Sequence, residues 1–183
     1  YPLRGGIAQY ISILYLELKK KGHDVLIINF KRQYPKFLFP GKTQDETSQD
    51  AIKVDSDIII DSINPWTWYR AYRRIKRHQS DLLVFKYWMP FFAPCFGMIA
   101  RWVKWFTGTK TLFICDNIIS HEKRLGDTVL TKFALKPIDY FITQSDIVKK
   151  DLLSLKPHAV WQDAPHPIYN IFGDIQKKNH AKQ

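Results

Sequence analysis

Residues 6–30, "GIAQYISILYLELKKKGHDVLIINF", decide the fold, because the pattern changes there from helical to strand-like. Apolar residues recur at i, i+4, i+7 and i+11 from Ile7 onward, which places them on one face of a helix. Lysines at 19–21 fill the last turn, where the helix dipole favours cations, and Gly22 supplies the stop. The segment 24–30 is short and mostly apolar and has three residues branched at Cβ, which predicts a strand buried on both faces.

The same alternation continues along the chain. Apolar strand-like runs recur at residues 57–63, 82–88, 110–116, 140–145 and 159–164. Helix-length segments separate most of them, at 65–79, 90–106, 127–136 and 146–155. Repeated strand–helix–strand units with buried strands predict a parallel sheet wrapped by helices, a Rossmann-like, doubly wound α/β domain.

The predicted domain covers residues 1–174, and residues 175–183 form a polar tail or the start of a linker. A doubly wound domain normally has a strand directly before its first helix. Only a few residues precede the helix that begins near Ile7. We therefore expect the first strand to lie outside this sequence.

Composition and charge narrow the classes of partner. The chain has 183 residues, of which 45% are hydrophobic, and this excludes wholesale disorder. A formal net charge of +11 favours anionic partners, namely nucleic acid, an acidic membrane surface or phosphate-bearing small molecules. Cys95 and Cys115 show neither metal-ligand spacing nor a redox pair, which indicates a reduced, cytoplasmic compartment, and we expect no metal and no cofactor. The most apolar stretch, residues 89–100, contains two prolines and is too short to span a bilayer, so we expect a soluble protein.

Polar residues near the carboxyl ends of the predicted strands are the candidates for a binding site. Gly5 and Gly6 precede the first helix, where they either let a phosphate approach the backbone or simply make a tight turn. Ser145 directly follows another strand and is a natural helix N-cap. His166 lies between two prolines, in a rigid, turn-like position, and a lone histidine is more often structural than functional.

Residues 115–127, "CDNIISHEKRLGD", follow a further strand and concentrate polar side chains. They offer a base, hydrogen-bonding groups and cations for a phosphate or a sugar hydroxyl, although a polar loop that caps a helix would have the same composition. The six residues are Asp116, Asn117, His121, Glu122, Lys123 and Arg124.

Two segments mix basic and aromatic residues, at 66–78 and 101–106. This mixture suits a peripheral position on anionic lipid, with the rings at headgroup level. It also suits stacking on single-stranded nucleic acid, or a helix with a solvated basic face and buried rings. The membrane-surface candidates are Arg70, Arg73, Arg74, Arg77, Trp102, Lys104 and Trp105.

Four stretches in order carry a family resemblance: "PLRGGIAQYISILYLELKKKGHDV" (2–25), "RQYPKFLFPGKTQ" (32–44), residues 115–127, and "HPIYNIFG" (166–173). Together they resemble a bacterial branch of the family 4 glycosyltransferases, which have the GT-B fold. The resemblance implies two Rossmann-like domains facing across a cleft, of which this chain is the N-terminal, acceptor-binding one. The nucleotide-sugar donor would bind a second domain, which is missing here, so we expect this chain alone to be inactive.

The resemblance also implies roles for residues. Gly5 and Gly6 would approach the donor diphosphate from across the cleft. The family often has a histidine where this chain has Asp116, which would instead accept hydrogen bonds from sugar hydroxyls, with His121 in a polar role from the adjacent loop. The acceptor side of the cleft would include Arg4, Asn117, Glu122, Lys123, Arg124, Ser145 and His166.

The implied reaction is a retaining, metal-independent transfer from a nucleotide-sugar to a saccharide or lipid-linked acceptor, with the basic helices toward the inner membrane surface. Two other interpretations of the function remain. One is a non-enzymatic α/β domain that binds nucleic acid or other anions, although the chain contains no known nucleic-acid-binding module. The other is a self-sufficient small α/β enzyme that uses Asp116 and His121.

Overall fold

The computed structural model describes residues 5–35, 52–119 and 125–165. Its helices are α1 (Gly6–Lys20), α2 (Pro65–His78), a short 3-10 turn η2 (Pro90–Phe92), α3 (Ala93–Phe106), α4 (Asp127–Leu135) and α5 (Asp146–Leu155). Its strands are β1 (Ile28–Arg32), β2 (Asp57–Asp61), β3 (Leu82–Tyr87), β4 (Lys110–Cys115), β5 (Tyr140–Thr143) and β6 (Val160–Asp163). The predicted alternation of strands and helices is confirmed.

All of the described strand pairs are parallel, as a Rossmann-like α/β fold requires. Strands β3, β4, β5 and β6 form one sheet in that order, and β1 and β2 form a separate two-stranded sheet. The expected single sheet is therefore divided in two within the described part of the chain. Both sheets share one core, because Phe30 of β1 and Phe85 of β3 pack against Phe96 of α3, with ring centroids 6.1 and 5.0 Å apart.

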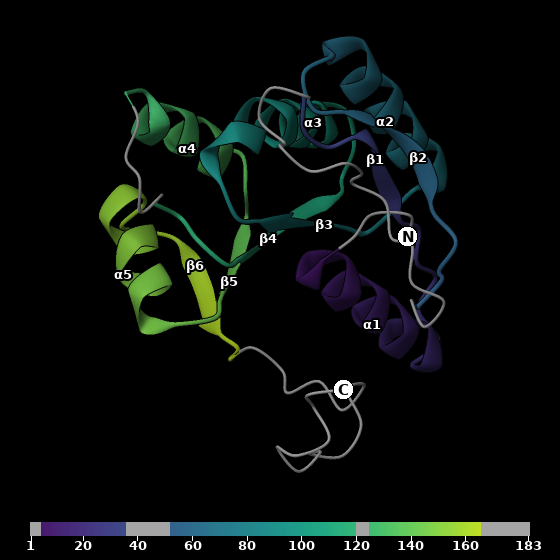
Figure 1. Cartoon of the computed structure of the whole chain (residues 1–183), viewed down its shortest axis with the longest axis horizontal. Coiled ribbons are helices and arrows are strands. Elements are labelled where there is room, and N and C mark those ends of the chain that lie inside the picture. Colours follow the sequence, from purple (N-terminus) through teal and green to yellow (C-terminus); the bar gives the residue numbers. More distant parts are fainter. Residues whose placement is uncertain (1–4, 36–51, 120–124, 166–183) are drawn as a thin grey trace, which may run out of the picture.

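Helices cover both sides of the strands (Figure 1). Helices α2, α3 and α4 lie together on one side, while α1 lies on the other side of β1 and β3. The core between α3 and the strands is aromatic. Tyr87 stacks on Phe113, with centroids 5.0 Å apart, and Phe113 meets Phe141 edge-on at 6.2 Å. These large buried rings fix the position of the four-stranded sheet against α3.

Local sequence signals account for several helix boundaries. Gly22 has a φ of 83°, in the left-handed region that favours glycine, and α1 ends just before it as predicted. Asn64 caps α2 by accepting a hydrogen bond from the Trp66 amide at 3.1 Å, and Pro65 occupies the first helical position. Ser145 caps α5 through the Val148 amide at 3.4 Å, so its predicted capping role is confirmed.

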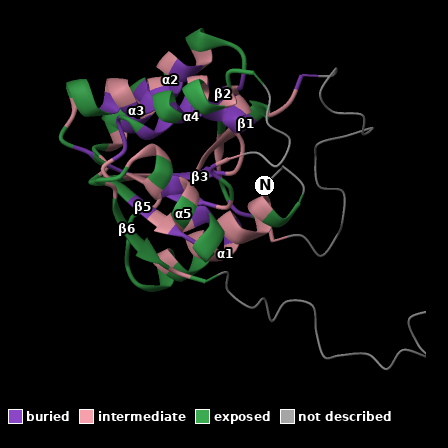
Figure 2. Ribbon diagram, turned by 90° about the vertical axis from the view of Figure 1, so that its left-hand side faces the viewer, coloured by how far each residue is buried: buried purple, intermediate pink, exposed green. Residues whose placement is uncertain are grey.

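The strand expected at residues 24–30 differs from the prediction. Pairing begins only at Ile28 and runs to Arg32, and Phe30 is the one fully buried residue of β1. The expectation of burial on both faces was wrong because α1 covers this region loosely. The apolar residues of α1 are only half-buried, and its one buried residue is Ser12. Figure 2 shows α1 in the colours of intermediate and exposed residues, whereas buried residues gather where α2 and α3 meet the strands.

Candidate functional site

The two-residue period of a strand brings three polar side chains together at the carboxyl ends of β3, β4 and β5. Lys86 of β3 pairs in register with Ile114 of β4, which pairs with Ile142 of β5. Asp116 and Gln144 each lie two residues beyond these partners, so they point to the same side of the sheet as Lys86. This is the edge at which Rossmann-like folds bind ligands.

Lys86 is the centre of this cluster. Its Nζ donates to Asp116 Oδ1 at 2.5 Å and to Gln144 Oε1 at 2.7 Å. The same Nζ lies 3.9 Å from the ring centroid of Tyr10 on α1, which adds a cation–π contact. The Lys86 side chain is only 3% exposed, and its buried ammonium group has partners from α1 and from the segments that follow β4 and β5. We call Tyr10, Lys86, Asp116 and Gln144 the carboxyl-edge cluster.

Burial lowers the pKa of Lys86 from its ordinary value, and the hydrogen bond and charge of Asp116 act in the opposite direction. Asp116 is itself held at two points, since its amide donates to the Tyr87 carbonyl at 2.9 Å and its carboxylate accepts from Lys86. The Asp116 side chain is nevertheless 23% exposed. It is therefore an oriented carboxylate that solvent reaches, and it can accept hydrogen bonds from ligand hydroxyls.

The sequence reasoning missed Lys86, Gln144 and Tyr10. One signal was present, a single lysine inside the otherwise apolar run at residues 82–88. Lysine is almost never fully buried unless it is paired, so a lysine at an interior strand position predicts an acidic partner nearby. The register of neighbouring parallel strands then favours Asp116 as this acidic partner, because it directly follows the adjacent strand.

The structure brings Asn117 and Ser145 to the same edge, directly after Asp116 and Gln144, and both are exposed. Gly5 caps α1 with a φ of 109°, and no side chain caps this end of the helix. A Cβ built on Gly5 or Gly6 meets no atom within 4 Å among the described residues. The remaining candidates, Arg4, His121, Glu122, Lys123, Arg124 and His166, lie outside the described residues.

The basic aromatic candidates divide into two groups. Arg74 Nε donates to Asp57 Oδ2 at 2.6 Å, and Lys104 Nζ donates to Asp139 Oδ1 at 2.7 Å. Trp102 meets the ring of Tyr69 edge-on, with centroids 5.7 Å apart. Arg74, Lys104 and Trp102 therefore have structural contacts within the fold.

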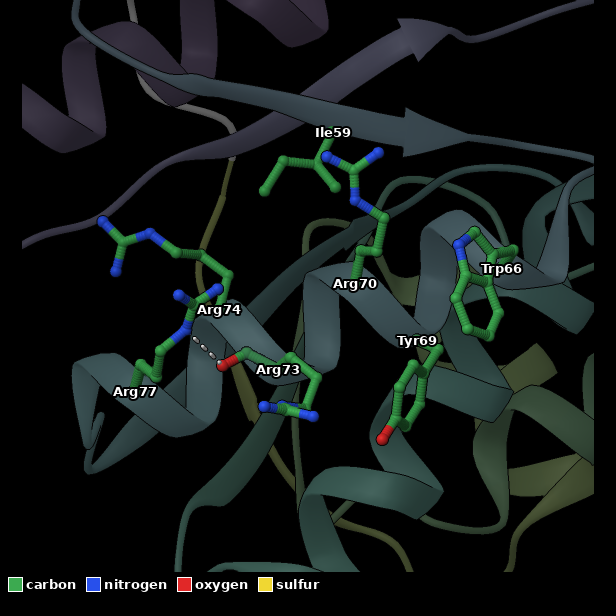
Figure 3. Close-up of a pocket in the computed structure, with 7 residues that line it drawn as sticks. All are labelled: Ile59, Trp66, Tyr69, Arg70, Arg73, Arg74 and Arg77. Carbon is green, nitrogen blue, oxygen red and sulfur yellow. Dashed lines mark hydrogen bonds between the residues drawn. The ribbon is translucent and has the colours of Figure 1, made fainter.

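The other group, Arg70, Arg73, Arg77 and Trp105, is exposed. Its three arginines line a shallow cavity of about 280 Å³ beside α2. The other lining residues are Ile59, Trp66, Tyr69 and the ion-paired Arg74. Figure 3 shows these side chains and the hydrogen bond from Arg77 Nε to the Arg73 carbonyl, which measures 3.4 Å.

No three His, Cys, Asp or Glu side chains gather as a metal site within the described ranges. Cys95 and Cys115 are free and buried, and burial raises the pKa of both thiols well above the ordinary value. Neither is suited to act as a nucleophile. In the part of the chain that the structure covers, no helix has the length and apolar character needed to cross a membrane.

No family model, no curated protein and no solved structure matches this chain. The resemblance to family 4 glycosyltransferases therefore depends on its four ordered motifs. The first is described from Gly5 onward and contains the turn into α1. The third contributes Asp116 to the carboxyl-edge cluster, whereas most of the second motif and all of the fourth lie outside the described residues.

Proposed function

We propose that this chain is the acceptor-binding domain of a retaining, metal-independent glycosyltransferase, which moves a sugar from a nucleotide-sugar to a saccharide or lipid-linked acceptor. The observation that carries the proposal is the carboxyl-edge cluster. It places an oriented, solvent-accessible carboxylate at the ligand-binding edge of a Rossmann-like fold. The ordered motifs supply the reaction class.

In this proposal Asp116 accepts a hydrogen bond from an acceptor hydroxyl. Lys86 is a positioning residue, because its contacts with Asp116 and Gln144 fix the carboxylate before the ligand arrives. A carboxylate that is already oriented loses little freedom on binding, so it holds a hydroxyl more firmly than a freely rotating one. Asn117 and Ser145 offer further polar groups beside it.

The donor side of the proposed site needs a second domain, which the GT-B resemblance implies. The start of α1 at Gly5 and Gly6 presents backbone N–H groups and the positive end of the helix dipole. These groups offset negative charge on a departing nucleoside diphosphate without a metal ion. In this proposal residues 1–183 alone bind acceptor and transfer little or no sugar.

The test is a transfer assay of the natural-length protein with a panel of nucleotide-sugars, measured as release of nucleoside diphosphate with and without saccharide acceptors. We expect at least one donor to support transfer, and Asp116→Asn to lower kcat by about 100-fold or more. The matched control is Asp139→Asn, which removes a carboxylate that is also ion-paired but precedes β5 at the opposite ends of the strands. Its kcat should stay within about threefold of wild type.

Two results would contradict the proposal. One is the absence of transfer with every donor and acceptor, and the other is a folded Asp116→Asn variant with wild-type activity. Full transfer by residues 1–183 alone would instead support a self-sufficient small enzyme.

A further inference from the structure

The outer face of α2 is a single basic stripe. Trp66, Arg70, Arg73 and Arg77 recur at i, i+4, i+7 and i+11, which aligns them along about 16 Å of the helix. The opposite face of α2 is anchored in the core. Its buried residues are Trp68, Ala71, Tyr72 and Ile75. The helix is therefore fixed in place, and the stripe necessarily faces outward.

The charged residues of α2 and α3 are all cationic. Helix α2 contains five arginines and lysines and α3 contains two, and neither helix contains an aspartate or glutamate. No carboxylate in the described ranges forms an ion pair with Arg70, Arg73 or Arg77. Cations at this spacing on a helix repel one another, so an external anion bound between them is stabilising.

Exposed aromatic rings lie at the start of α2 and at the end of α3. Trp66 is 69% exposed at the start of α2, and Trp105 and Phe106 are 63% and 58% exposed at the end of α3. Phe106 is tied to α2 through Tyr72, with ring centroids 6.0 Å apart. Figure 2 shows exposed segments on the outer turns of both helices. Large rings left in water beside cations are typical of a surface that meets a partner.

We propose that this face of α2 and α3 seats the protein on an anionic phospholipid bilayer. Arg70, Arg73 and Arg77 bind lipid phosphates, because guanidinium groups match phosphate oxygens in charge and geometry. The rings of Trp66, Trp105 and Phe106 lie at headgroup level, where an aromatic ring keeps apolar contact on one side and water on the other.

The observations favour a bilayer over single-stranded nucleic acid. Proteins that bind single strands use a basic groove with successive rings on which bases stack. Here the arginines lie along the outer face of one helix, with rings beside them only near its start, and the other exposed rings lie at the end of α3. The cavity beside the arginines is about 280 Å³ and shallow, which suits a headgroup phosphate and not the track of a strand.

The test is co-sedimentation of the full 183-residue chain with vesicles of phosphatidylcholine alone or with 30% phosphatidylglycerol, at low and high salt. We expect binding only to the anionic vesicles, weakened by salt.

The variants test which residues bind the vesicles. Arg70→Gln/Arg73→Gln/Arg77→Gln should lower the partition coefficient at least about tenfold. Lys19→Gln/Lys20→Gln/Lys21→Gln is the matched control, since it removes the same charge from the end of α1, and it should change binding less than about threefold. Trp66→Ala/Trp105→Ala should also weaken binding, while circular dichroism confirms that every variant is folded.

Several outcomes would overturn the proposal. Equal losses in the two triple variants would mean that net charge alone drives binding. Equal binding to both vesicle types, or no binding to either, would exclude the anionic surface. Tighter, Arg-dependent binding of a single-stranded oligonucleotide at the same salt would assign the stripe to nucleic acid. Displacement by millimolar inorganic phosphate would indicate a site for a free anion. Because the assay contains no sugar, its result is independent of the proposed glycosyl transfer.

Discussion

Lys86 and the arginines of the α2 stripe differ in burial and in their contacts. Lys86 is 3% exposed and has an acidic, an amide and an aromatic partner, from three separate segments of the chain. The arginines of the α2 stripe are exposed, and no described carboxylate pairs with them. Burial explains the difference, since a charge removed from water needs partners inside the fold and a solvated one does not. Lys86 should therefore fix the geometry of the site, and the exposed arginines should govern binding to an external anion.

The largest effect is expected from Asp116→Ala, because it leaves the buried ammonium of Lys86 without its countercharge. We expect the free energy of unfolding to fall by about 3 kcal/mol. Lys86→Met should cost less than about 1 kcal/mol, since it fills the same space without a charge and leaves an Asp116 that is partly solvated. Urea unfolding of the two variants measures this asymmetry, and equal losses would show that Lys86 is not a truly buried charge.

An intermediate effect is expected at Asp139, whose side chain is 20% exposed and pairs with the half-exposed Lys104. Asp139→Asn should lower the free energy of unfolding by about 1–2 kcal/mol at pH 7, because Asp139 also accepts hydrogen bonds from the amide and hydroxyl of Thr111.

This contribution should depend on pH. Burial alone would raise the pKa of Asp139, but the hydrogen bonds from Lys104 and Thr111 outweigh it and hold that pKa below 3.8. Since the folded state favours the carboxylate, its contribution is complete above pH 3.8 and is lost as the pH falls through the lowered pKa. Urea unfolding between pH 7 and pH 3 should show wild type and Asp139→Asn converging at the acid end. A constant difference would contradict this account.

The smallest effect on stability is expected from Arg70→Gln/Arg73→Gln/Arg77→Gln. The free energy of unfolding should stay within about 0.5 kcal/mol of wild type, because the three groups are solvated and replacing them also relieves mutual repulsion. Urea unfolding of this triple variant and of wild type measures the difference. A loss above about 2 kcal/mol would mean that the stripe has structural partners and is not free for a ligand.

Local sequence patterns predicted the helices and strands well, because helix and strand signals depend on neighbouring residues. Helical spacing from Ile7, the stop at Gly22 and the cap at Ser145 each depend on residues only a few positions apart. Two features were not predicted, namely the loose cover of β1 by α1 and the division of the sheet. Both depend on which elements become neighbours in space, and residue spacing along the chain does not determine that.

The candidate site was predicted in part. Asp116 was expected because it follows a strand, and strand ends of a Rossmann-like fold meet at one edge. Lys86 was missed because an apolar run was treated as uniform, although a lysine inside it needs a partner. Gln144 and Tyr10 join the site only through the register of β5 and the position of α1.

The central claim is that the Lys86–Asp116 pair is kept for ligand binding and not for stability. The double variant Lys86→Met/Asp116→Asn tests it most directly, measured by urea unfolding and by the proposed sugar transfer. We predict a free energy of unfolding within about 1 kcal/mol of wild type, because no buried charge is left unpaired, together with a loss of transfer of about 100-fold or more. A double variant that transfers sugar at the wild-type rate would contradict the claim.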